Sequence, residues 1–127
     1  MSHKLVIIES PFAGDVEANV AYAKECMRDS LRRGEAPYAS HLLYAQPGIL
    51  DDLVPEERAL GIEAGLAWGE AAALTAVYID LGISKGMRYG IERAIAANRT
   101  VVARSLRGLS DLEMWAALDL PARLRCP

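Results

Sequence analysis

The run KLVIIE at residues 4–9 decides the fold, because its centre is continuously apolar and rich in β-branched side chains. Such a run is typical of a strand that is buried on both faces, as parallel sheets require. Ser10-Pro11 ends it, since a proline lacks the backbone donor that a central strand needs. Two similar runs follow, TAVYID at 75–80 and TVVAR at 100–104. The chain therefore contains at least three strands that need cover on both faces.

Helical patterns separate these strands, and each begins with a recognisable capping residue. Asp15, Ser84 and Ser110 are suited to N-caps, and Pro55 is suited to the first position of a helix. The predicted helices span residues 15–33, 55–74, 84–97 and 110–118. The second contains three glycines four residues apart, which would let it pack closely against a sheet or another helix. Residues 36–45 are the least clear segment and fit a short strand followed by a loop.

Strands that alternate with helices indicate parallel βαβ units with right-handed crossovers. We therefore expect an α/β fold, a small Rossmann-like three-layer domain with a short parallel sheet of about four to five strands. The length of 127 residues fits one domain. The expected domain spans residues 1–127, with a core at 4–105 and a C-terminal helix and tail at 106–127.

Composition limits the classes of partner and the cellular compartment. The net charge of −3 gives no general attraction to nucleic acid. No apolar stretch approaches the 18 residues of a membrane span, and the N-terminus lacks the apolar region of a signal peptide. Cys26 and Cys126 fit neither a metal motif nor a disulfide framework, which favours free thiols in the cytoplasm. We expect no metal, no cofactor, no nucleic acid and no membrane contact.

In open parallel sheets, ligands bind outside the carboxyl ends of the strands. The loop ESPFAGD at residues 9–15 follows the first strand directly. Glu9 could bind a sugar hydroxyl, Phe12 could stack on a base, and Gly14 precedes a helix N-terminus suited to an anion. Ser10 lies in the same loop. The alternative is an ordinary turn between a strand and a helix.

The segment DLGISKGM at residues 80–87 is the second candidate. Asp80 ends a buried strand and could bind a hydroxyl or a base. Ser84 opens a helix whose free backbone N–H groups favour an anion, and Gly86 would let a ligand approach beside Met87. His41 lies in a third segment predicted at the crevice. A capping serine, a turn aspartate and a structural histidine are the ordinary alternatives.

Three motifs carry a family resemblance. They are IIESPFAGD at 7–15 with Asn19 in the next helix, ERALGIEAGLAW at 57–68, and YIDLGISKGMRYGIERA at 78–94 followed by TVV. In this order the chain resembles the nucleoside 2-deoxyribosyltransferase-like superfamily, which includes deoxynucleotide N-glycosidases. It looks closest to a branch common in actinobacteria and their phages.

The resemblance implies that the first loop holds sugar and base and that the helix after the middle strand holds phosphate or sugar. It also implies a glutamate nucleophile four residues after Gly86, where this chain has Gly90. Glu92 lies two residues further on, a rotation of about 200° around a helix, on the opposite face. A second family carboxylate is replaced by Gly65. Members of the superfamily are commonly homo-oligomers.

The prediction is a protein that binds a nucleoside or nucleotide and cleaves or transfers its N-glycosidic bond. One alternative is a binding or sensing module without catalysis, and another is an oligomeric interaction protein that associates through its glycine-rich helix. The candidate catalytic residues are Asp80, Glu92 and Glu9. The candidate binding residues are Ser10, Phe12, Gly14, His41, Ser84, Gly86 and Met87.

Overall fold

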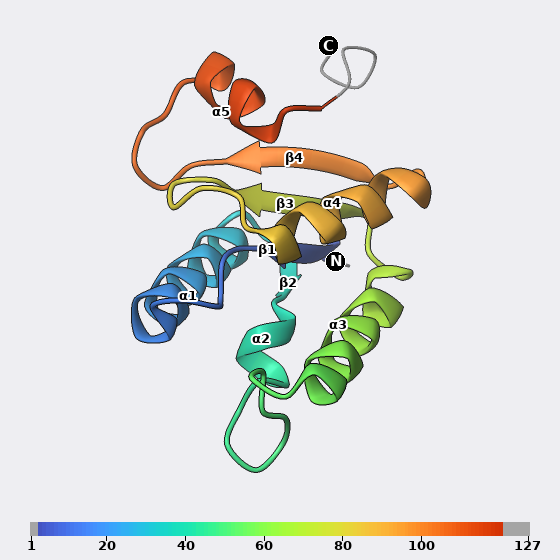
Figure 1. The fold of residues 1–127 in the computed structure, drawn as a ribbon. Helices are drawn as coiled ribbons and strands as arrows, with labels where there is room; N and C mark the ends of the chain where they lie inside the picture. The colour runs from blue at the N-terminus through green and yellow to red at the C-terminus, as the bar shows by residue number, and fades with distance from the viewer. Residues whose placement is uncertain (1–2, 121–127) are drawn as a thin grey trace.

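The computed structural model describes residues 3–120, which form a four-stranded parallel sheet in the order β2-β1-β3-β4 (Figure 1). The strands are β1 (Leu5–Glu9), β2 (Ala36–Tyr38), β3 (Leu74–Tyr78) and β4 (Thr100–Arg104). In the central pair, Glu9 lies opposite Val77, so β1 and β3 end at the same edge of the sheet. This arrangement confirms the α/β, Rossmann-like prediction with four strands.

Within residues 3–120, five helices connect and cover these strands. They are α1 (Val16–Arg32), α2 (Ser40–Leu43), α3 (Pro55–Gly69), α4 (Lys85–Ala96) and α5 (Asp111–Leu118). The predicted caps are present: Asp15 accepts from the Ala18 amide at 3.2 Å, and Ser84 accepts from the Met87 amide at 3.2 Å. Ser110 caps α5 in the same way. None of the described helices is long and apolar enough to cross a membrane.

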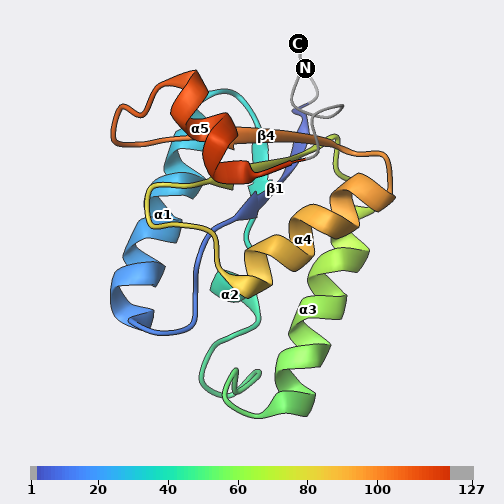
Figure 2. The same ribbon diagram turned by 45° about the horizontal axis from the view of Figure 1, so that its top comes forward.

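The helices form layers on the two faces of the sheet (Figure 2). Tyr22 and Cys26 of α1 pack against one face of the sheet, in a cluster with Val6, Ile8, Ala76 and Tyr78. The opposite face packs against α4 and α5, in a cluster that contains Val77, Ile79, Met87, Ile91 and Leu118. Successive residues of β3 therefore face two separate apolar cores, with Ala76 and Tyr78 in one and Val77 in the other, as a three-layer domain requires.

The structure differs from the sequence prediction at the end of α3, at the end of β3, which is Tyr78 rather than Asp80, and in the segment after β2. Helix α3 ends at Gly69 rather than Leu74, because Leu74 is a buried residue of β3 that pairs with Val6. A continuous apolar run does not distinguish a helix from a buried strand, so the boundary was not visible in the pattern. The one-turn helix α2 lies in the segment predicted as strand and loop.

Cys26 is a free, buried thiol, whereas Cys126 lies outside the described residues.

A buried polar network lies between α1 and the sheet. The Arg104 guanidinium donates to both carboxylate oxygens of Glu35, at 2.8 and 2.7 Å, and to the Tyr78 hydroxyl at 3.2 Å. Ser30 also donates to Glu35, at 2.6 Å. These hydrogen bonds hold the pKa of Glu35 below its ordinary value despite its burial. Each charge is paired, as burial in a low dielectric demands.

Candidate functional site

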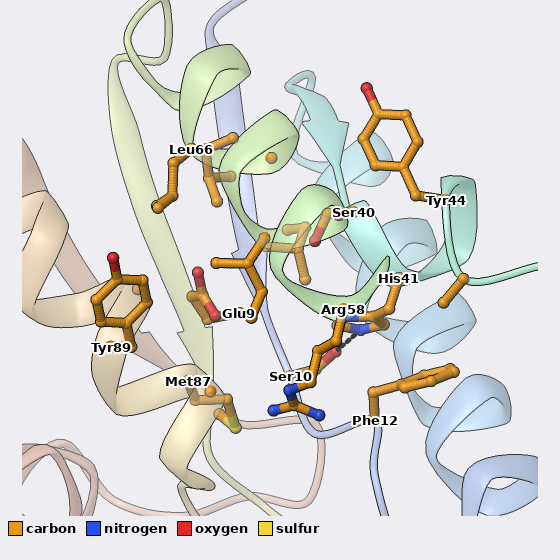
Figure 3. A pocket seen from close by; sticks show the side chains of 18 of the residues that line it. Glu9, Ser10, Phe12, Ser40, His41, Tyr44, Arg58, Leu66, Met87 and Tyr89 are labelled. Atoms are coloured by element: carbon orange, nitrogen blue, oxygen red, sulfur yellow. Dashed lines mark hydrogen bonds between the residues drawn. The ribbon is translucent and has the colours of Figure 1, made fainter. Parts of the chain in front are cut away.

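A cavity of about 340 Å³ lies between the α4-covered face of the sheet and helices α2 and α3 (Figure 3). Its volume is in the range of small-molecule sites. It begins outside the carboxyl end of β1 and continues along the sheet face, since Thr75 near the amino end of β3 also lines it. The predicted crevice therefore extends further beneath the helices than the topology alone suggested.

Glycines on both flanking helices create part of this space. Gly61, Gly65 and Gly69 of α3 line one wall, and Gly86 and Gly90 of α4 line the other. A Cβ atom at residue 65 would lie 2.8 Å from the Ser40 Cβ, which is closer than real Cβ contacts. The three evenly spaced glycines of α3 thus form one face of the helix, and that face is turned toward the cavity.

Glu9 is the acidic side chain that points between α3 and α4 (Figure 3). It is partly exposed, it lines the cavity, and no hydrogen bond or ion pair joins its carboxyl group to another described residue. Burial raises the pKa of Glu9 to about 8, although the nearby Arg99 charge acts to lower it. Removal from water disfavours the ionised form of a carboxyl group. At neutral pH this group is therefore mostly protonated.

Ser10, Phe12 and His41 form a second cluster in the cavity wall. The Ser10 hydroxyl lies 3.1 Å from His41 Nε2, and the rings of Phe12 and His41 stack with centroids 5.3 Å apart. Burial lowers the pKa of His41 to about 4, while the charge of Asp52 acts to raise it. The imidazole is neutral at physiological pH and can hold Phe12 as a flat aromatic surface.

The first turn of α4 forms the cationic part of the site. Lys85 and Gly86 begin the helix, where free backbone N–H groups favour negative charge. The Arg58 guanidinium lies 3.6 Å from the Cβ position of Gly86, and it also pairs with Asp52 at 3.1 Å. This corner is suited to an anionic group such as a phosphate.

Most of the predicted binding residues line this cavity, whereas two of the three predicted catalytic carboxylates, Asp80 and Glu92, do not. The cavity is lined by Glu9, Ser10, Phe12, His41, Ser84, Gly86 and Met87. Gly14 is exposed, with a φ of +100°, and does not line it. Glu92 is exposed on α4 and also lies outside the cavity lining, in keeping with its rotation away from Gly90.

Asp80 does not end the strand as predicted: β3 ends at Tyr78, and Asp80 lies two residues later in the turn that follows, outside the residues that line the cavity. Its carboxylate accepts hydrogen bonds from the Tyr22 hydroxyl at 2.6 Å, the Ser105 hydroxyl at 2.5 Å and the Leu106 amide at 2.8 Å. These bonds hold the pKa of Asp80 below its ordinary value, although burial opposes them. Through these hydrogen bonds Asp80 holds Ser105 and Leu106, the two residues that follow β4, in position.

Sequence reasoning did not single out several cavity residues: Ser40, Arg58, Tyr89 and Arg99. Arg99 precedes β4 and so enters from the amino end of the sheet, where no ligand was expected. The signal that could have located this wall is the i, i+4, i+8 spacing of Gly61, Gly65 and Gly69. Within residues 3–120, no group of three or more His, Cys, Asp or Glu side chains is placed to hold a metal ion.

Comparison with known proteins supports the fold description and identifies the family. No curated protein matches the sequence. The structure is similar to that of the 2-deoxyribosyltransferase from the psychrotolerant bacterium Bacillus psychrosaccharolyticus, a biocatalyst for the synthesis of antiviral and antitumoral nucleosides. The TM-score is 0.59, with 18% sequence identity, over 90% of this chain and 82% of the other. Residues 4–104 match the model of a family described as Domain of unknown function (DUF7768), and the chain therefore belongs to that family.

Proposed function

We propose that the cavity binds a nucleoside or nucleotide and that the protein cleaves or transfers its N-glycosidic bond. The observation that carries this proposal is the presence of two groups in one cavity, the stacked rings of Phe12 and His41 and the unpartnered carboxyl group of Glu9. An aromatic face binds a nucleobase by stacking. A carboxyl group in a ligand cavity can bind a sugar hydroxyl or take part in glycosidic chemistry.

The proposed arrangement assigns one part of the ligand to each part of the cavity. The base stacks on Phe12, the sugar lies near Glu9, and a phosphate, where present, binds at Ser84, Gly86 and Lys85. Ser10 holds His41 in place behind the aromatic surface, since its hydroxyl lies 3.1 Å from Nε2. Met87 supplies an apolar surface from α4.

The structural similarity to a 2-deoxyribosyltransferase supports this assignment at the level of fold. The motifs at 7–15, 57–68 and 78–94 support placing the chain in the nucleoside 2-deoxyribosyltransferase-like superfamily, and we propose its actinobacterial and phage branch. Gly65 and Gly90 separate this chain from the two-carboxylate pattern of that superfamily. Both acids of that pattern are absent here. Of the carboxyl groups that line the cavity, Asp52 pairs with Arg58 and Glu57 accepts from a backbone amide, whereas Glu9 has no such partner among the described residues.

The proposal is tested by incubating the pure protein with a panel of nucleosides, deoxynucleosides and their 5′-monophosphates, and separating the products by chromatography. We expect free base from at least one class, and an increase in melting temperature with the same class, because a ligand that binds the folded state stabilises it. Stabilisation without base release would favour the non-catalytic binding module. Neither effect across the panel would contradict the proposal.

A second candidate function, self-association, is favoured by the outer face of α3. Apolar residues lie on every side of this helix, yet Gly69 is its one buried residue, and Leu60 and Trp68 are 62% and 58% exposed. Helices that are apolar all round are usually covered. We propose that a second copy covers this face. Light scattering should then show a dimer or larger assembly that Leu60→Glu dissociates, and a monomeric wild-type protein would contradict it.

A further inference from the structure

We infer that Glu9 is the catalytic proton donor of the proposed reaction, and that Gly90 is glycine because the Glu9 carboxyl group fills the place of its side chain. The inference rests on the proposed function and deepens it. It assigns the acid to the end of strand β1, whereas the family resemblance predicts a carboxylate on helix α4.

The geometry at residue 90 shows how closely the two residues are matched. A Cβ atom built on Gly90 would lie 2.6 Å from Cδ and 2.9 Å from Oε1 of Glu9, with Oε2 closer still. Real Cβ atoms essentially never make non-bonded contacts under 3.0 Å, so any side chain at residue 90 would displace the carboxyl group. Gly86, one turn earlier on α4, has no such conflict, because its nearest neighbour would be 3.6 Å away.

The carboxyl group of Glu9 also lacks the bonds that mark a structural acid. Asp80 accepts hydrogen bonds from two hydroxyls and a backbone amide, and Glu35 pairs with Arg104. Among the described residues, Glu9 has no hydrogen-bond or ion-pair partner of this kind, although its side chain opens into the cavity (Figure 3). Buried acids are normally satisfied, and an exception in a cleft is a candidate for chemistry.

The charge state of Glu9 suits a proton donor better than a nucleophile. With its pKa raised to about 8, the group is mainly protonated at neutral pH. A general acid is most effective when its pKa lies near the working pH. A carboxylate nucleophile would have to act from the minor, ionised form in the same site.

The proposed step balances as a hydrolysis. The C1′–N bond breaks with its electron pair on the nitrogen that was bonded to C1′, and the Glu9 carboxyl group donates its proton to that same nitrogen. The oxygen of a water molecule bonds to C1′, and its proton returns to the Glu9 carboxylate. The products are the free base and the sugar, and Glu9 is again protonated. In transfer, a ring nitrogen of a second base takes the place of the water.

The test compares wild-type protein with Glu9→Gln and Gly90→Ala. Glu25→Gln, at an exposed position of α1, is the matched control. Folding is checked by circular dichroism and nucleoside binding by calorimetry. We expect Glu9→Gln to bind nucleoside but to lose base release by about 100-fold or more, the usual contribution of a general acid. Gly90→Ala should also lose base release, because its methyl group moves the carboxyl group, and Glu25→Gln should behave as wild type.

A pH profile separates the two possible roles of Glu9. If Glu9 is the proton donor, the wild-type rate of base release falls as the pH rises through about 8, because the group loses its proton. The residual rate of Glu9→Gln should not show this decrease. A wild-type rate that rises over this range would assign a nucleophile and overturn the inference. Retention of the wild-type rate by Glu9→Gln would overturn it while leaving the proposed function intact. A wild-type protein that releases no base would refute the catalytic proposal and this inference together.

Discussion

Replacement of Glu9 by glutamine should stabilise the protein, and increasingly so as the pH rises. The folded state raises the pKa of this carboxyl group from 4.5 to about 8, mainly by burial. Between these values the folded chain holds a proton that the unfolded chain has released. Folding stability therefore decreases as the pH rises from 4.5 to 8, and the loss is complete above 8. Glutamine is neutral throughout and removes this dependence.

The size of the effect follows from the two pKa values. Each pH unit between them corresponds to about 1.36 kcal/mol, so the largest possible penalty is about 5 kcal/mol at pH 8 and above. At pH 7 the corresponding ceiling is about 3 kcal/mol, and near pH 4.5 it vanishes. The cavity is open to solvent, so we expect a measured difference of a few kcal/mol at alkaline pH rather than the full ceiling.

The measurement is urea unfolding of wild type, Glu9→Gln and Glu25→Gln at pH 5, 7 and 8.5, followed by circular dichroism. The free energy of unfolding of Glu9→Gln should exceed that of wild type by an amount that grows across the series. Glu25→Gln should follow the wild-type curve, because its site is exposed. A difference between Glu9→Gln and wild type that does not change with pH would refute the reasoning about burial.

Three further substitutions test other parts of the structure. Asp80→Ala removes three hydrogen bonds and should lower the free energy of unfolding by about 2–4 kcal/mol in urea titrations, while base release per folded molecule at low temperature persists. Phe12→Ala should raise the dissociation constant for nucleosides about tenfold in calorimetry, since stacking on one aromatic ring contributes about 1–3 kcal/mol. Glu35→Ala leaves Arg104 buried without its partner and should cost about 3–5 kcal/mol, seen as a lower melting temperature.

The fold was largely predictable from the sequence because its signals are local. The run at residues 4–9 is apolar enough to require cover on both faces, and the structure places β1 in the centre of the sheet. Ser84 and Ser110 cap α4 and α5 as predicted, since an N-cap needs only a side-chain oxygen and the next turn of backbone. The end of α3 was not predictable, because apolar content alone does not separate it from β3.

The candidate site was predictable only in part, because its decisive contacts join residues far apart in the sequence. Ser84 and Gly86 could be placed at a strand's carboxyl edge from topology. The meeting of Glu9 with Gly90 could not, since it depends on how β1 and α4 are packed. Asp80 occupies the expected edge, yet its side chain turns to Tyr22 and Ser105, and a pattern of residues does not reveal side-chain direction.

The strand order has a consequence for how the cavity forms during folding. The sheet consists of two units that are each local in sequence: one contains β1, α1 and β2, and the other contains β3, α4 and β4. The pairing of β1 with β3 joins the two units, and these two are the paired strands that are furthest apart in the sequence. Contacts between distant segments carry the larger loop-closure cost. Glu9 belongs to the first unit and Gly90 to the second, so their meeting depends on the docking of the two halves. A nucleoside that contacts both units would hold them together, and it would therefore slow the unfolding of the protein.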